Sequence, residues 1–268
     1  MMAGPNFADL ASSGVPGFNE LYYLSKYSDA SDAVNNGNYE SGLAYYQAIG
    51  KNRGDLIFNA GTKISGSSTD DEIKAFDLGF LTIDAGEGVD SVVYGSNKSS
   101  YTVEENSSNW KVSNSSLFSG FDELKSVERV KFSDGTLALD IDPGDTAGQA
   151  YRLYQAAFAR TPDMPGVAYH MNDMESNGLS VVQIARNFIA SPEFKTQYGE
   201  NPTEDEYINL LYQNVLGRTP GQFEIDYYKE RFESGTTDWN TTLVFFAESP
   251  ENVSLVAPQI EDGIWMPF

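Results

Sequence analysis

The residues best suited to chemistry in this chain form a turn rich in glycine and aspartate at positions 84–92, DAGEGVDSV. This turn approximates the nonapeptide Gly-Gly-x-Gly-x-Asp-x-U-x of calcium-binding parallel β-rolls. In such a turn, the glycines let the backbone bend so that carbonyl and carboxylate oxygens face a hard cation. The residues of this turn that form the candidate calcium site are Asp84, Gly86, Gly88 and Asp90.

A weaker copy of the turn lies upstream, at Gly66 to Ile73, and keeps an acid at Asp71. The spacing from Asp71 to Asp90 is close to two periods of the nonapeptide. A β-roll site takes its ligands from successive turns. Two interpretations stay open at this point. One is a calcium site built from Asp71, Asp84, Gly86, Gly88 and Asp90, and the other is a structural remnant that only forms turns.

Other reactive groups are scarce. The chain has no cysteine, which excludes disulfides and thiolate metal sites. It has a single histidine, His170, so a Ser-His-Asp triad could be built only around that residue. His170 follows Tyr169 in a helical pattern, so we expect it to pack rather than to catalyse. Arg160 and Arg218 precede Thr-Pro at helix ends, where we expect them to hold carbonyls and the facing loop. We therefore predict no catalytic residues and no enzyme activity.

The charge balance is strongly acidic, with 39 Asp and Glu against 17 Lys and Arg, for a net charge of −22. An acidic surface repels phosphate backbones and anionic lipids, so we expect no nucleic-acid partner. No run approaches the ~18 apolar residues of a membrane span, so no direct membrane insertion is expected. The N-terminus shows no ordinary signal peptide.

The strongest pattern is a duplication in the second half of the chain, which repeats in one constant register without a gap. Leu153-Tyr154-Gln155 recurs as Leu211-Tyr212-Gln213, and Ser191-Pro192-Glu193 recurs as Ser249-Pro250-Glu251. Each Ser-Pro-Glu supplies an N-cap hydroxyl, a first-turn proline and an acid at the positive helix end. A duplicated helical unit buries its apolar face largely against its copy.

These patterns predict a multidomain α+β protein with a short N-terminal helical module, a β-rich, β-roll-like middle and an all-α C-terminal repeat domain. Short strand-like runs that alternate with Gly, Ser, Asn and Asp indicate that the middle region is β-rich. The expected parts are an N-terminal arm (1–17), a helical module (18–54), a β-rich domain with degenerate calcium turns (55–141), a duplicated helical domain (142–260) and a C-terminal tail (261–268).

The segments YRLYQAAFARTPD, SPEF and LLYQNVLGRTP resemble a bacterial domain of unknown function related to the phycobilisome linker fold, over residues 147–258. After Thr219-Pro220 the chain departs from that family's loop. The middle region resembles the segment that precedes this domain in secreted RTX-type and S-layer-like proteins, and residues 22–54 look like a helical module of the same proteins. The resemblance implies an extracellular or cell-surface location and type I secretion through the C-terminal end.

The leading hypothesis is a non-enzymatic structural protein that self-assembles as an S-layer, fibre or matrix subunit, with calcium as an expected cofactor. A second hypothesis is a virion protein, such as a capsid decoration, fibre or tail component. A third is an adhesin that binds glycans through exposed tyrosines or Trp110. The expected partners are accordingly other copies of the chain, another surface or virion protein, or a glycan.

Overall fold

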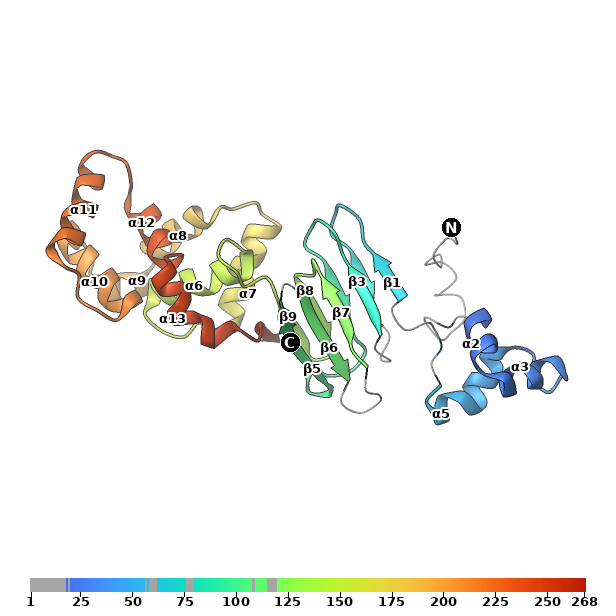
Figure 1. Ribbon diagram of the computed structural model, residues 1–268. Helices are drawn as coiled ribbons and strands as arrows, with labels where there is room; N and C mark the ends of the chain where they lie inside the picture. The colour runs from blue at the N-terminus through green and yellow to red at the C-terminus, as the bar shows by residue number, and fades with distance from the viewer. Residues whose placement is uncertain are drawn as a thin grey trace. The chain divides into compact units, whose positions relative to one another are not determined.

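The computed structural model describes residues 18, 20–55, 57, 62–75, 80–107, 109–114 and 120–268. The chain divides into two compact units, residues 1–134 and 135–268. The fold class expected from the sequence is confirmed, with a helical N-terminal module, a β-rich middle and a helical C-terminal region (Figure 1). The expected N-terminal arm lies outside the described residues.

The N-terminal module folds around tyrosine rings. Tyr23 is fully buried, and its hydroxyl donates to Asp55 Oδ2 at 2.6 Å. Arg53 donates to both oxygens of the same carboxylate, so the chain leaving the last helix is tied back to the first. The elements are α2 (Glu20–Lys26), α3 (Ser28–Asn35), α4 (Gly42–Tyr45), the π-helix η1 (Tyr46–Gly50) and α5 (Lys51–Arg53).

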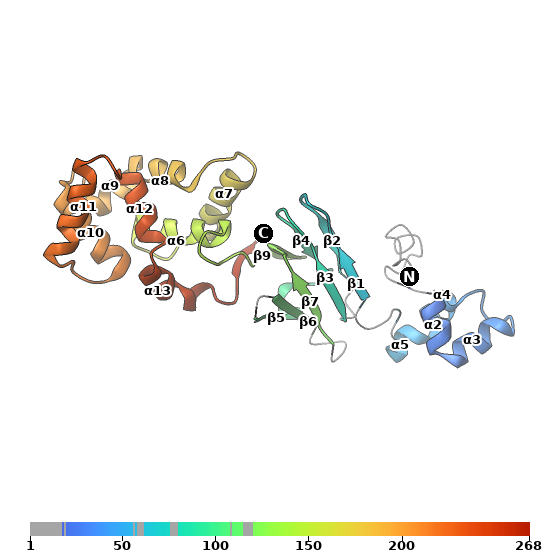
Figure 2. The same cartoon turned by 45° about the horizontal axis from the view of Figure 1, so that its top comes forward.

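The middle region is a short parallel solenoid of three rungs, and each rung contributes one strand to each of two sheets. In the first sheet, β1 pairs in parallel with β3, and β3 pairs with β7. In the second, β2 pairs in parallel with β4, and β4 pairs with β8 (Figure 2). The rungs are β1 (Thr62–Ser65) with β2 (Glu72–Lys74), β3 (Leu81–Asp84) with β4 (Ser91–Val93), and β7 (Asp122–Lys125) with β8 (Arg129–Phe132).

The solenoid core follows from the alternation of side chains along each strand. Every rung places at least one aliphatic residue from each sheet inside. These buried residues are Ile64, Ile83 and Leu124 from the first sheet and Ile73, Val92 and Val130 from the second. The first two rungs are related by the same sequence offset in both sheets, as Leu81 pairs with Thr62 and Ser91 with Glu72.

A hairpin interrupts the solenoid between its second and third rungs. The short 3₁₀ helix η2 (Lys98–Ser100) leads into β5 (Tyr101–Asn106) and β6 (Asn109–Asn114), which pair antiparallel. Strand β6 also pairs antiparallel with β7, so the first sheet has the order β1-β3-β7-β6-β5. The hairpin therefore covers the β7 edge, at the third rung.

The second unit begins and ends with strands. After a two-residue turn at Ser133 and Asp134, β9 (Gly135–Ala138) pairs antiparallel with β10 (Ile264–Pro267). The sequence predicts only a tail over residues 261–268, whereas the structure places four of these residues in a strand. This strand forms by pairing with β9, which is distant in the sequence, so residues 261–268 carry no local pattern that predicts it.

The helices of this unit repeat in the register expected from the sequence. Helices α6 and α10 are both 13 residues long, and α7 and α11 are both 12. The first copy is α6 (Thr146–Phe158), α7 (Met164–Glu175), α8 (Val181–Ala190) and α9 (Pro192–Tyr198). The second is α10 (Glu204–Leu216), α11 (Gln222–Glu233), α12 (Trp239–Ala247) and α13 (Pro250–Ile260).

Caps and core explain why the copies fold alike. Ser191 and Ser249 both accept the expected N-cap hydrogen bond, from Phe194 N and Asn252 N. One apolar core holds residues from both copies, including the repeat-related Leu153 and Leu211 and the pair Phe188 and Phe246. Among the residues the structure describes, no helix is long and apolar enough to cross a membrane.

Candidate functional site

The candidate turns stack on one another at one side of the solenoid. Residues 66–71 connect β1 to β2, residues 85–90 connect β3 to β4, and residues 126–128 connect β7 to β8. Gly86 has a φ of +107°, and a Cβ there would lie 2.1 Å from Ser67 O in the turn below. Glycine is therefore required both by the backbone angle and by the close approach of the next turn.

Stacked carboxylates bond to backbone amides across these turns. Asp90 Oδ1 accepts from Asp71 N at 2.8 Å, and Glu128 Oε2 accepts from Asp90 N at 2.7 Å. Asp71, Asp90 and Glu128 therefore form a ladder, one acid per rung, in which each acid after the first caps the amide of the rung before it. We call these three residues the acid ladder. Within its own turn, Asp71 Oδ2 accepts from Ser67 N at 2.6 Å.

Asp90 is the unusual member of the ladder. Its side chain is fully buried, and its second oxygen, Oδ2, has no hydrogen-bond partner among the described residues. Burial raises the pKa of the Asp90 carboxyl above its ordinary value, and the nearby charges of Asp71 and Asp70 raise it further, against the lowering effect of the Asp71 N–H.

The structure brings four of the five predicted calcium residues to the stacked turns: Asp71, Gly86, Gly88 and Asp90. Asp84 lies at the end of β3, where its carboxylate pairs with Lys125 Nζ at 2.6 Å and is 43% exposed. Within the described ranges there is no group of three or more His, Asp or Glu side chains arranged to hold a metal ion. Asp71 and Asp90 accept hydrogen bonds from backbone amides, as a turn-forming role requires, whereas Asp84 bonds to a lysine.

Repeat-related arginines form the same contact in both helical copies. Arg160 Nε donates to Glu193 Oε1 and Arg218 Nε to Glu251 Oε1, both at 2.7 Å. Each guanidinium also lies over the ring of a tyrosine, 5.1 Å from the Tyr154 centroid in one copy. Each arginine thus ties the end of its copy's first helix to the start of the fourth. The sequence predicted a structural role for these residues, but not the carboxylate partners.

In each copy the arginine also bonds to the acid that caps the second helix. In the first copy, Arg160 Nη2 donates to Asp163 Oδ2 at 3.2 Å, and Asp163 accepts from Gly166 N at the start of α7. Arg218 Nη2 donates to Glu224 Oε1 at 2.8 Å, and the hydrogen bonds and charge of Arg218 lower the pKa of the Glu224 carboxyl to about 2. Glu224 also accepts from Gly221 N and so caps α11.

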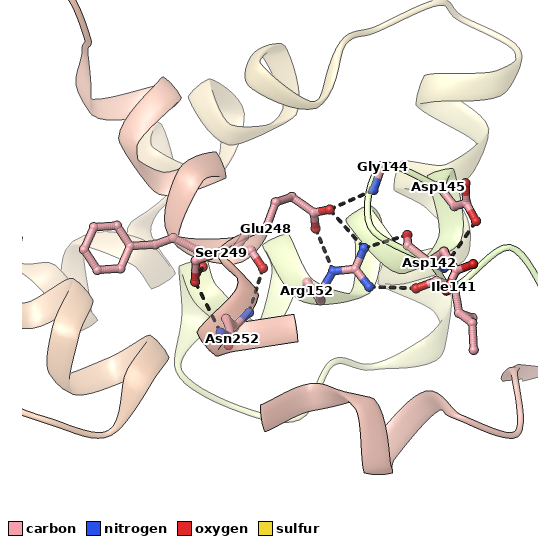
Figure 3. A network of polar contacts seen from close by, with 10 residues as sticks. Ile141, Asp142, Gly144, Asp145, Arg152, Glu248, Ser249 and Asn252 are labelled. Carbon is pink, nitrogen blue, oxygen red and sulfur yellow. Dashed lines mark hydrogen bonds and ion pairs between the residues drawn. The ribbon is translucent and has the colours of Figure 1, made fainter. Parts of the chain in front are cut away.

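A buried ion pair that the sequence did not indicate holds the start of this unit (Figure 3). Arg152 is 1% exposed and donates through Nε to Glu248 Oε1 at 2.7 Å. Its other nitrogens donate to Ile141 O at 2.8 Å and Asp142 O at 3.0 Å. Glu248 Oε2 in turn accepts from Gly144 N at 3.1 Å. The pair thus fixes the segment before α6 against the end of α12.

His170 has the packing environment expected from the sequence. Its ring lies 4.6 Å from the Phe188 ring, edge to face, and its Nδ1 is 3.3 Å from Asp173 Oδ2. Burial lowers the pKa of the His170 imidazole, against the raising effect of Asp173.

A shallow groove of about 570 Å³ lies where the two helical copies meet, between α9 and α10. Amide side chains line part of it, together with the carboxylates of Glu200 and Glu206 and the apolar surfaces of Tyr198, Pro202 and Leu210. The amides are Gln197, Asn201, Asn209 and Gln213. The amides both donate and accept hydrogen bonds and the two carboxylates accept them, so this groove is suited to a ligand that carries hydroxyl groups and no negative charge.

Comparison with known families matches part of the helical unit. Residues 185–256 match a family described as a domain of unknown function (DUF4214). The match runs from α8 of the first copy into α13 of the second, so it spans the junction between the copies. No curated protein matches the chain.

Proposed function

We propose that the protein is a non-enzymatic structural subunit of an extracellular assembly, such as an S-layer, fibre or matrix. The observation that carries the proposal is that the solenoid and the helical domain are both built from stacked repeats, with charged groups that bond between the repeated elements. The solenoid stacks turns through the acid ladder, and the helical unit repeats the Arg160–Glu193 contact as Arg218–Glu251. Repeat stacking produces extended surfaces suited to assembly.

The acidic surface supports the same function. A net charge of −22 keeps individual chains soluble and apart at low ionic strength, and screening by salt or divalent cations reduces that repulsion. Self-association should therefore increase with ionic strength. Calcium binding at the stacked turns stays a prediction from the sequence.

Sedimentation velocity of the full chain tests the proposal. We expect the sedimentation coefficient to rise with protein concentration and with salt. Parallel titrations with calcium and with magnesium at constant ionic strength, each followed by EDTA, separate general screening from specific binding, because general screening does not distinguish the two divalent cations. A chain that stays monomeric up to millimolar concentration in all of these conditions would overturn the proposed function.

The amide-lined groove favours a second candidate, a glycan-binding adhesin. Neutral sugars are bound through paired donors and acceptors, which Asn209 and Gln213 offer on one face of α10. A glycan array probed with the wild-type chain and with Gln213→Ala tests this function. Binding that Gln213→Ala weakens supports it, and an array without signal removes it.

A further inference from the structure

The first rung of the solenoid has two strand edges whose backbone groups point outward. Asp84 O accepts from Gly66 N, so the backbone of Gly66 faces β3. The direction of the backbone N–H and C=O groups alternates along a strand. Those of Ile64 therefore also face β3, and those of Lys63 and Ser65 face away from it. The first sheet therefore ends, at the first rung, in a strand that directs hydrogen-bonding groups away from the stack.

The second sheet follows the same logic. Val93 O accepts from Ala75 N, and Asp71 O accepts from Ser91 N. The backbone groups of Glu72 and Lys74 consequently face away from β4. In the part of the chain that the structure describes, no strand pairs with the outer edge of β1 or of β2.

The two edges belong to one surface. Strands β1 and β2 form the same rung and end their respective stacks together (Figure 2). Ile64 lies two residues before the turn at 66–71 and Ile73 lies two residues after it, so the two isoleucines are at the same distance from the turn on β1 and β2. A partner that satisfies both edges must present two strands with the spacing of a solenoid rung.

We propose that the first-rung edge pairs with the same edge of a second copy of this chain, in a two-fold symmetric contact. This inference rests on the proposed assembly function and gives it a location. Rotation about an axis that passes beside Ile64 and Ile73 makes each edge strand antiparallel to its counterpart. Lys63 then faces Ser65 of the copy, Glu72 faces Lys74, and about eight backbone hydrogen bonds form.

Charge complementarity selects a second copy rather than an unrelated strand. In this register each Glu72, which already accepts from Lys131 Nζ at 2.8 Å within its own chain, also meets a Lys74 of the copy, and the two-fold axis creates that pair twice. Lysines on an edge discourage pairing with arbitrary strands. They do not oppose this register, because an acid lies opposite Lys74. The contact is isologous and closes as a dimer.

A proline at the edge provides the first test. Lys74→Pro removes an outward N–H without removing any hydrogen bond to β4, and prolines are tolerated on edge strands. We expect the dimer to weaken roughly thirtyfold in sedimentation equilibrium, because the symmetric pair loses two hydrogen bonds. The matched control, Lys74→Ala, keeps the N–H and should weaken the dimer by less than about fivefold.

A charge exchange provides the second test and does not depend on the tolerance of proline. Lys74→Glu places two acids opposite each other twice and should weaken the dimer roughly tenfold. Adding Glu72→Lys restores opposite charges across the contact but removes the pair with Lys131 within the chain, so it should recover part of the lost affinity. A double variant that is no better than the single one would overturn the proposed register.

Hydrogen exchange gives a readout at single amides in the wild-type chain. On raising the concentration, the amides of Lys63, Ser65, Glu72 and Lys74 should become protected, while those of Ile64 and Ile73 change little because they already bond to the neighbouring strands. Assembly that persists in Lys74→Pro, with these four amides unprotected, would overturn this inference and leave the proposed function standing. A chain that never self-associates would overturn both.

Discussion

The buried pair of Arg152 and Glu248 leads to a quantitative prediction. The variant Glu248→Ala removes the carboxylate that pairs with a guanidinium only 1% exposed. Breaking a buried ion pair by removing one partner costs about 3–5 kcal/mol, because the other charge stays buried. Two backbone carbonyls continue to accept from Arg152, so we expect a loss of about 3 kcal/mol in the free energy of unfolding.

The internal repeat supplies the matched double variant. In the register of the repeat, Leu210 stands in the place of Arg152, and Ala190 in the place of Glu248. The double variant Arg152→Leu with Glu248→Ala removes both charges together. It should lose about 1–2 kcal/mol, mainly from carbonyls that no longer have a donor. The double variant is therefore expected to be more stable than the single one.

Urea unfolding followed by helical circular dichroism measures these differences. Glu251→Ala is the control, because the pair of Arg218 and Glu251 is exposed (37% and 43%) and should contribute about 1 kcal/mol or less. If Glu248→Ala cost no more than Glu251→Ala, burial would not control the strength of these pairs. A double variant less stable than Glu248→Ala would refute the argument from the uncompensated charge.

Two further predictions concern the solenoid. Because the pKa of the Asp90 carboxyl is raised in the folded state, its protonated form favours folding. This contribution to the free energy of unfolding is complete below the pKa of the unfolded state, near 3.8. It is lost as pH rises through the pKa of the folded state. Asp90→Asn should therefore gain stability relative to the wild type as pH rises above about 4, and a constant difference in urea midpoint would contradict this assignment. Gly86→Ala should cost more than about 2 kcal/mol in thermal unfolding, because its Cβ meets Ser67 O. Gly178→Ala, also at positive φ but in open space, is the control and should cost about 1 kcal/mol.

The helical repeat was largely predictable because its signals are local. The Ser-Pro-Glu caps of both copies and the capping box of Thr203 and Glu206 lie within a few residues of the helix ends that they define. The structure places helix boundaries where these residues indicate. Local hydrogen bonding is encoded in adjacent residues and needs no knowledge of the rest of the fold.

The candidate site was predictable in part. The two turns that the sequence singles out stack on each other, and Asp71 lies beside Asp90 because their spacing equals one rung of a parallel stack. The spacing could not show that Asp84 turns to Lys125, nor that Glu128 completes the acid ladder. Glu128 follows Asp90 by 38 residues, twice the 19-residue offset between Asp71 and Asp90. The hairpin lies between them and residues 126–128 contain no glycine, so the nonapeptide pattern does not mark this turn.

The sequence by itself determined the repeat, the caps and the turn glycines, each through backbone preferences that act over a few residues. Only the tertiary structure decided which charges meet. Arg152 and Glu248 lie far apart in the chain, at the start of the first copy and near the end of the second, and β10 pairs with β9 across nearly the whole second unit. Such contacts depend on how the elements stack, and the energy that fixes them comes from burial, which exists only once the chain has folded.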